Sequence, residues 1–232
     1  MSGRGVALLL GLAALAAVVQ LAPVAAEEPA KLVAPYLRAR DDRSHGHVAG
    51  HAVGDPRRPS AAPVPYEGVS VMLLPRSPGF EAELEAIKAH FRDSLRHYMD
   101  ATSDVSEARA TYERALLGAG GGELIRGEVS DARGLIRFAD IPAGEWLLLA
   151  WRSQDHPGKA AKVRKEDATA FREVPVSVGH SVVTYWLVPL AVQPGETTEV
   201  ELNDRNVWLT GVREDLRVIE GTPKTSGSKK RR

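Results

Sequence analysis

Residues 127–151 read GEVSDARGLIRFADIPAGEWLLLAW, in which short apolar segments alternate with turn signals. Asp131 and Gly134 bound the first turn, where glycine tolerates the positive φ that a tight turn requires. Pro142 and Gly144 form a second corner, which is expected to send the chain from one sheet to another. The run WLLLAW that follows is short enough for a strand buried on both faces. The segment therefore predicts successive strands of a β-sheet protein.

Further strand candidates lie on both sides of this segment. In residues 67–74, for example, Val69, Val71 and Leu73 share one face. Turn signals recur between the candidates every eight to twelve residues or so, which is typical of a sandwich. We therefore expect an all-β protein, an antiparallel β-sandwich of about seven or eight strands. The candidate strands are 45–53, 67–74, 123–130, 135–138, 145–152, 172–178, 181–192, 197–202 and 207–212.

Residues 80–117 interrupt the strands with helical periodicity. Asp104 and Glu107 have the spacing of a capping box ahead of a second apolar stripe, and the glycines from Gly118 onward end it. We expect a helical hairpin inserted in the sandwich, where it covers one sheet face or edge. The first stripe consists of Phe80, Leu84, Ile87, Phe91, Leu95 and Tyr98.

The N-terminal segment, residues 1–26, has the features of a signal peptide. Arg4 precedes a stretch of Leu, Ala and Val, and Val24-Ala25-Ala26 fits the small-residue cleavage pattern. An uncleaved anchor is the alternative, because the apolar stretch is just long enough to span a bilayer. Pro23 and the acidic pair after Ala26 favour cleavage. We expect a periplasmic or secreted protein that is not an integral membrane protein after signal removal.

The remaining segments divide the mature chain. Residues 27–44 are charged and contain prolines, which predicts a linker. Residues 153–168 are polar and rich in lysine, which predicts a long exposed loop. Residues 219–232 are too polar to pack and are expected to form a disordered basic tail. The sandwich with its insertion is therefore expected to span residues 45–218.

Charge and composition exclude several classes of function. The chain has 30 basic and 30 acidic residues, so it offers no overall electrostatic footprint for nucleic acid. It has no cysteine, which excludes disulfides, thiolate metal sites and cysteine nucleophiles. No Gly-x-Ser-x-Gly elbow and no nucleotide-binding glycine loop occurs. We therefore expect a protein that is not an enzyme and does not bind nucleic acid.

The segment quoted above resembles the pattern T-D-x-x-G-x-F-x-F-x-x-L-P-x-G-x-Y-x-L of the carboxypeptidase regulatory-like domains, with Trp146 where that family often has Tyr. Residues 67–73 and 193–202 resemble the opening and closing strands of the same family. The resemblance implies a transthyretin-like (prealbumin-like) sandwich that serves as an accessory module. Related enzymes that hydrolyse 5-hydroxyisourate need a C-terminal Tyr-Arg-Gly-Ser signature, whereas this chain ends SGSKKRR.

Three histidines, His45, His47 and His51, occur in the first predicted strand. Alternate residues of a strand point the same way, so all three are expected on one face. Imidazoles two residues apart lie about 6–7 Å apart along a strand, and both could reach one Zn²⁺ or Cu²⁺. His51 needs a bulge, for which Gly50 is available. The alternatives are thus a periplasmic Zn or Cu site and incidental, solvated histidines.

Four tryptophans, Trp146, Trp151, Trp186 and Trp208, are flanked by Leu and Val at strand positions, which favours core packing over a carbohydrate platform. The sequence therefore predicts an exported, non-enzymatic binding or scaffolding module of the cell envelope. Its partner is expected to be another envelope protein or a glycan, bound at the helical hairpin or at residues 153–168. Metal binding and carbohydrate binding are the alternative functions.

Overall fold

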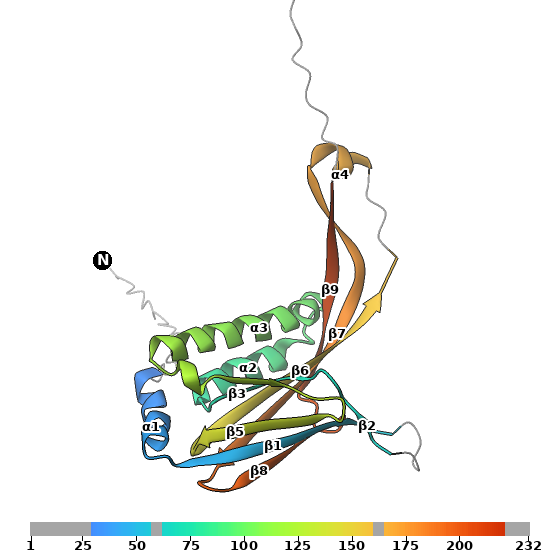
Figure 1. The fold of residues 1–232 in the computed structure, drawn as a ribbon. Coiled ribbons are helices and arrows are strands. Elements are labelled where there is room, and N and C mark those ends of the chain that lie inside the picture. The colour runs from blue at the N-terminus through green and yellow to red at the C-terminus, as the bar shows by residue number, and fades with distance from the viewer. Residues whose placement is uncertain (1–28, 57–61, 160–164, 221–232) are drawn as a thin grey trace, which may run out of the picture.

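The computed structural model describes residues 29–56, 62–159 and 165–220, which form two packed β-sheets with helices added (Figure 1). The predicted β-sandwich is therefore confirmed. The four-stranded sheet contains β1 (His45–Gly54), β2 (Val64–Pro65), β5 (Leu135–Pro142) and β8 (Thr197–Leu202). The five-stranded sheet contains, in spatial order, β4 (Arg126–Val129), β3 (Ser70–Pro75), β6 (Gly144–Pro157), β7 (Glu173–Val192) and β9 (Leu209–Glu220).

The pairing of β1 with β8 departs from the expected antiparallel pattern. These two strands run parallel, from His47 opposite Thr197 to Ala52 opposite Leu202, whereas the other described pairs are antiparallel. Parallel neighbours need a long crossover connection. Here four strands of the five-stranded sheet, β3, β4, β6 and β7, lie between β1 and β8 in the sequence, and the chain returns to the edge of β1 that β5 leaves free.

Both turns of the 127–151 segment connect the two sheets. Asp131 Oδ1 accepts hydrogen bonds from the backbone N–H groups of Leu135 (2.9 Å) and Arg133 (2.8 Å), which lower the pKa of Asp131. Gly134 has φ +76°, and an added Cβ would lie 2.2 Å from the carbonyl oxygen of Ala52. Because β4 and β5 belong to different sheets, the predicted turn is present but joins the two sheets and is not a β-hairpin.

The described part of the predicted linker 27–44, residues 29–44, is instead part of the folded body. Residues Pro29–Asp41 form helix α1, in which Val33 and Tyr36 are buried. The Tyr36 ring meets Trp146 edge to face with centroids 5.1 Å apart, and its hydroxyl donates to the carbonyl oxygen of Glu145. Helix α1 therefore closes one end of the sandwich (Figure 1).

The predicted helical insertion is confirmed, but its two helices meet at a different point. Helix α2 spans Pro78–His90 and helix α3 spans Leu95–Gly118. The Oγ atom of Ser94 accepts from the backbone N–H of His97 and caps α3, so the second helix begins well before the predicted capping box at Asp104. Figure 1 shows both helices over the outer side of the five-stranded sheet, opposite the four-stranded sheet.

Strands β6, β7 and β9 are longer than predicted. Strand β6 continues to Pro157, and β7 is one strand with a bulge between Ser177 and Gly179, where we expected a break. A short helix, α4 (Lys165–Ala170), precedes β7 and begins within residues 153–168, which were predicted to be a loop. Figure 1 shows it where β7 and β9 extend away from the body. None of the described helices has the length and apolar character to cross a membrane. The predicted signal peptide and most of the predicted tail lie outside the described residues.

Tyr66 provides a pH-dependent test of the described fold. Its hydroxyl donates to Asp204 Oδ1 at 2.6 Å, and burial, followed by this hydrogen bond, raises the pKa of Tyr66 from 10.0 to about 12. Since the folded pKa is raised, the contribution to stability is fully present below pH 10 and is lost as the pH rises through about 12. We expect a tyrosinate absorbance titration to lose a component near pH 12 in Tyr66→Phe; loss of a component near pH 10 would contradict the Asp204 contact.

Candidate functional site

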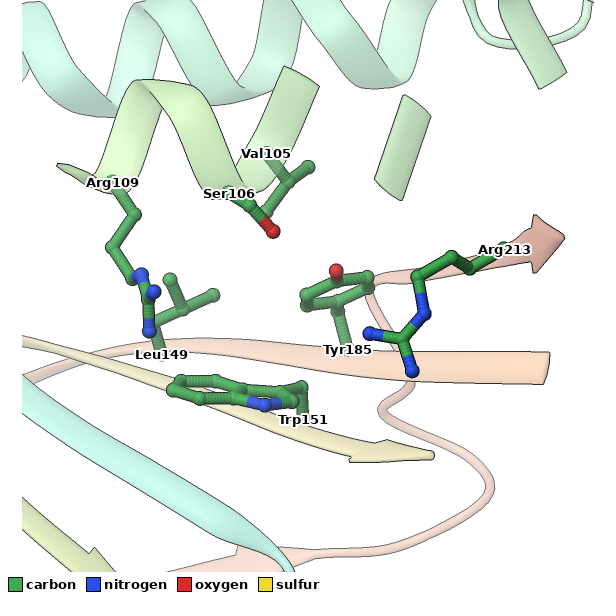
Figure 2. Close-up of a pocket in the computed structure, with 7 residues that line it drawn as sticks. All are labelled: Val105, Ser106, Arg109, Leu149, Trp151, Tyr185 and Arg213. Carbon is green, nitrogen blue, oxygen red and sulfur yellow. The ribbon is translucent and has the colours of Figure 1, made fainter. Parts of the chain in front are cut away.

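A cavity of about 190 Å³ lies between α3 and the outer face of the five-stranded sheet (Figure 2). Leu149 and Trp151 of β6 and Tyr185 of β7 contribute side chains from the sheet. The register pairs Trp151 with Tyr185, so their rings are neighbours on the face that α3 covers. The complete lining is Val105, Ser106, Arg109, Leu149, Trp151, Tyr185 and Arg213.

Two guanidinium groups approach this cavity from opposite sides. Arg109 comes from α3 and Arg213 from β9, with Trp151 below and Ser106 above (Figure 2). The guanidinium carbon of Arg109 lies 4.8 Å from the centroid of the Trp151 ring, a cation–π contact. Both ends of the cavity are therefore positively charged.

The two arginines differ in their ion pairing. Arg109 Nε lies 3.3 Å from Glu113 Oε1, but the angles do not make a hydrogen bond, and neither atom has another hydrogen-bond partner among the described residues. The side chain of Arg213 forms neither an ion pair nor a hydrogen bond with any residue that the structure describes. The positive charge in the cavity is therefore only partly balanced.

The Tyr185 hydroxyl contributes a neutral polar group. Burial raises the pKa of Tyr185, while Ser106 and the charges of Arg109 and Arg213 oppose that rise. The hydroxyl therefore stays protonated at neutral pH. The hydroxyls of Tyr185 and Ser106 both donate to the carbonyl oxygen of Thr102, at 3.4 Å and 2.9 Å. The two hydroxyl oxygens therefore offer acceptors beside an aromatic surface and two cations, a combination that suits a small, polar ligand.

Gly211 sets the distance between α3 and β9 beside this cavity. A Cβ at Gly211 would lie 2.5 Å from Oγ1 of the buried Thr102, one helical turn before Ser106. We expect Gly211→Ala to push α3 outward and to lower the free energy of unfolding by about 1–3 kcal/mol. Urea denaturation measures this. The matched control is Gly127→Ala, because an added Cβ there meets nothing within 4 Å; equal stability of the two variants would contradict the close contact.

The three predicted metal ligands lie on β1, outside this cavity. His47 and His51 are exposed and His45 is half-buried, on the outward face that the alternation predicted. The register shift lies between Gly46 and Val48 rather than at Gly50, and His51 Nε2 is 3.0 Å from the carbonyl oxygen of Arg133.

Further ligands for such a site are not close by in the described part of the chain. There, no group of three or more His, Asp or Glu side chains is arranged to hold a metal ion. Two further histidines, His156 and His180, face each other across β6 and β7 with ring centroids 5.1 Å apart. Metal binding by His45, His47 and His51 therefore stays a prediction.

The four tryptophans separate into two pairs. Trp146 and Trp186 are 0% and 1% exposed, and their indole N–H groups donate to backbone carbonyl oxygens, so both belong to the core. Trp151 lines the cavity described above. Trp208 lines a second, more open cavity of about 410 Å³ between α2 and β9, and donates to Glu85 Oε1 at 2.7 Å. The sequence identified Trp151 as a candidate but gave no signal for Arg109 or Arg213.

Comparisons with known proteins show distant likeness only. No family model matches the chain, and no curated protein matches it significantly. A candidate carbohydrate-binding protein of Pseudomonas aeruginosa superposes with a TM-score of 0.37 and 16% identity, over 69% of this chain and 88% of that one. The pilus backbone protein of Streptococcus pneumoniae superposes with a TM-score of 0.26 and 12% identity, over 68% of this chain and 40% of that one. A minor pilin of Streptococcus agalactiae superposes with a TM-score of 0.24 and 10% identity, over 79% of this chain and all of that one.

These scores are too low to support a functional assignment. The β-sandwich is established by the strands and sheets of the structure itself. The carboxypeptidase regulatory-like family stays a resemblance, because it rests on the residues between Gly127 and Leu148 and on the two flanking motifs.

Proposed function

We propose that this chain is an exported, non-enzymatic binding module of the cell envelope, and that it holds part of a glycan in the cavity between α3 and the five-stranded sheet. The observation that supports this proposal is the lining itself. An indole, two hydroxyls and two guanidinium groups surround one small space. Aromatic faces stack on the C–H faces of sugars, while guanidinium groups donate to sugar oxygens and the two hydroxyl oxygens accept from sugar hydroxyls.

The size of the cavity limits what can enter. At about 190 Å³ it is smaller than the roughly 300–1,000 Å³ of sites that enclose drug-sized ligands. It therefore suits one sugar unit or a substituent of one, with the rest of a longer chain in solvent. The alternative partner, another envelope protein, would contact the exposed surface of α2 and α3 instead of entering the cavity.

Binding to a glycan panel tests the proposal. We expect at least one glycan to bind the mature chain, and we expect Trp151→Leu to weaken that binding at least tenfold while the protein stays folded. Leucine keeps an apolar side chain against the sheet but removes the aromatic face. Trp208→Leu is the matched control, since Trp208 lines the other cavity. Absence of binding across the panel, or unchanged binding by Trp151→Leu, would overturn the proposal.

Export has its own test. The proposal places the mature N-terminus at Glu27, after the small-residue motif Val24-Ala25-Ala26. Mass spectrometry of the protein from the envelope or culture fraction should show a chain that begins there. A full-length chain recovered only from the cytoplasm would contradict export.

Metal binding at the outer face of β1 is a second proposal, favoured by the shared exposed side of His47 and His51. Titration of Zn²⁺ or Cu²⁺ into the wild-type chain and into the double variant His45→Ala/His47→Ala tests it. Equal affinities would end this proposal and leave the glycan proposal untouched.

A further inference from the structure

The cavity has more positive charge than a neutral sugar needs. Its seven lining residues include two arginines and no carboxylate. Arg109 is balanced in part by Glu113, which lies one helical turn along α3. Arg213 has no direct ionic partner among the described residues. Arg213 is exposed and Arg109 is half-buried, so the donors of Arg213 are open to an anionic group that reaches the cavity.

Two carboxylates, Asp155 and Asp215, lie on the arginine-bearing side of the sheet and share the Ser181 hydroxyl. Asp155 and Asp215 accept hydrogen bonds from the hydroxyl of Ser181, at 2.9 Å and 3.0 Å respectively. Ser181 is opposite Arg213 in the register of β7 and β9, yet neither carboxylate pairs with Arg213 or lines the cavity. The negative charges of Asp155 and Asp215 lower the electrostatic potential near Arg213, but neither carboxylate accepts a hydrogen bond from the Arg213 side chain.

The geometry places both guanidinium groups around one space. Figure 2 shows Arg109 and Arg213 on opposite sides of the volume above Trp151 and beside the Tyr185 hydroxyl. A guanidinium presents a planar fork of N–H donors that matches the oxygens of a carboxylate or sulfate. The helix above and the sheet below exclude part of the solvent, which strengthens such a charge interaction relative to open water.

We propose that the ligand of this site is an acidic sugar unit, whose anionic substituent lies between Arg109 and Arg213 while its ring contacts Trp151. This inference rests on the proposed glycan-binding function and adds the class of glycan. An inorganic anion satisfies the two arginines alone, whereas an acidic sugar uses the arginines, the hydroxyls and the indole together.

Paired glycans test the charge directly. The panel contains uronate oligosaccharides, the same oligosaccharides with each carboxylate reduced to an alcohol, sulfated counterparts, and inorganic sulfate alone. We expect the mature chain to bind an acidic member at least tenfold more tightly than its reduced counterpart, and to lose most of that preference in high salt. The uronate and sulfated arms show which anionic substituent is preferred.

Arg213→Gln provides the residue-level test. Glutamine keeps hydrogen-bonding capacity but removes the charge, so this variant should lose most of the preference for the acidic member, with only Arg109 left to pair with the anion. Arg217→Gln is the matched control, because Arg217 is another exposed arginine of β9 that does not line the cavity. The control should keep the tenfold preference, and the thermal midpoints of both variants should stay close to that of the wild type.

The possible failures are distinguishable. If reduced glycans bind as tightly as acidic ones and Trp151→Leu weakens both, the acidic-sugar inference is overturned and the glycan-binding function stands. If inorganic sulfate binds as tightly as every acidic glycan, the inference is overturned in favour of a simple anion site. If no glycan binds at all, the inference and the proposed function are both overturned.

Discussion

Replacement of Trp146 by alanine is expected to lower the free energy of unfolding by about 3–5 kcal/mol. The side chain is fully buried, and its ring contacts Tyr36 of α1 edge to face. Its indole N–H donates to the carbonyl oxygen of Pro142 at 2.9 Å. The truncation therefore leaves a large cavity and a buried acceptor without its donor. Chemical denaturation monitored by circular dichroism measures the change.

Trp208→Ala is the control for the Trp146 prediction. Trp208 is only half-buried, and its indole N–H donates to the exposed Glu85 at the edge of the helical layer. Loss of this side chain exposes less new surface and creates no closed cavity, so its cost should be clearly smaller. Equal losses of stability in the two variants would contradict the placement of Trp146 in the core.

Replacement of Tyr36 by alanine is expected to lower the free energy of unfolding by about 3 kcal/mol. Tyr36 anchors α1: its ring packs on Trp146, and its hydroxyl donates to Glu145 and accepts from the backbone N–H of Arg76 at 3.2 Å. Tyr36→Phe keeps the ring and removes the hydroxyl, so it should cost only about 1 kcal/mol. Denaturant midpoints of the two variants measure the difference.

The Tyr36 series also tests whether residues 29–41 belong to the fold. A linker tolerates Tyr36→Ala with a change of less than about 0.5 kcal/mol, as surface substitutions generally do. Such a result would show that α1 does not close the sandwich in solution. If Tyr36→Ala is clearly less stable than Tyr36→Phe, the result supports a helix α1 that is packed on the sandwich.

The core strands could be predicted because the alternation of inward apolar and outward residues along a strand can be recognised within a few residues. Val71 and Leu73 alternate with a less buried Met72, and Phe138 and Ile141 lie in a strand bounded on both sides by turns whose chemistry is local. Strand β8 has the boundaries that the sequence predicted, residues 197–202. Turn residues and period-two patterns are short-range signals, so they do not require knowledge of the distant partner.

Helix α1 and the extended strands could not be predicted for a physical reason. In α1 only Val33 and Tyr36 are buried, Pro35 lies between them, and charged residues surround them. This stripe is too short to establish a period. Residues 153–157 at the end of β6 are exposed, and they are ordered by pairing with β7, which side-chain patterns do not encode.

The candidate site depended on contacts between distant segments. Periodicity places Arg109 on α3 and Arg213 on β9, but it does not say that these two elements enclose one space. An arginine in a polar surface segment is ordinarily solvated, so neither residue attracts notice in the sequence. Trp151 was visible as a candidate because a strand tryptophan has only two common roles, core and platform.

Mapping by NMR tests the central claim most directly. The mature chain, labelled with ¹⁵N, is titrated with the tightest-binding acidic glycan, and the amide and indole shifts are followed. The largest changes should occur at Ser106, Arg109, Trp151, Tyr185 and Arg213, with little change on the outer face of β1. Changes confined to β1 or to the surface of α2, or no saturable change with any glycan, would contradict a binding site beneath α3.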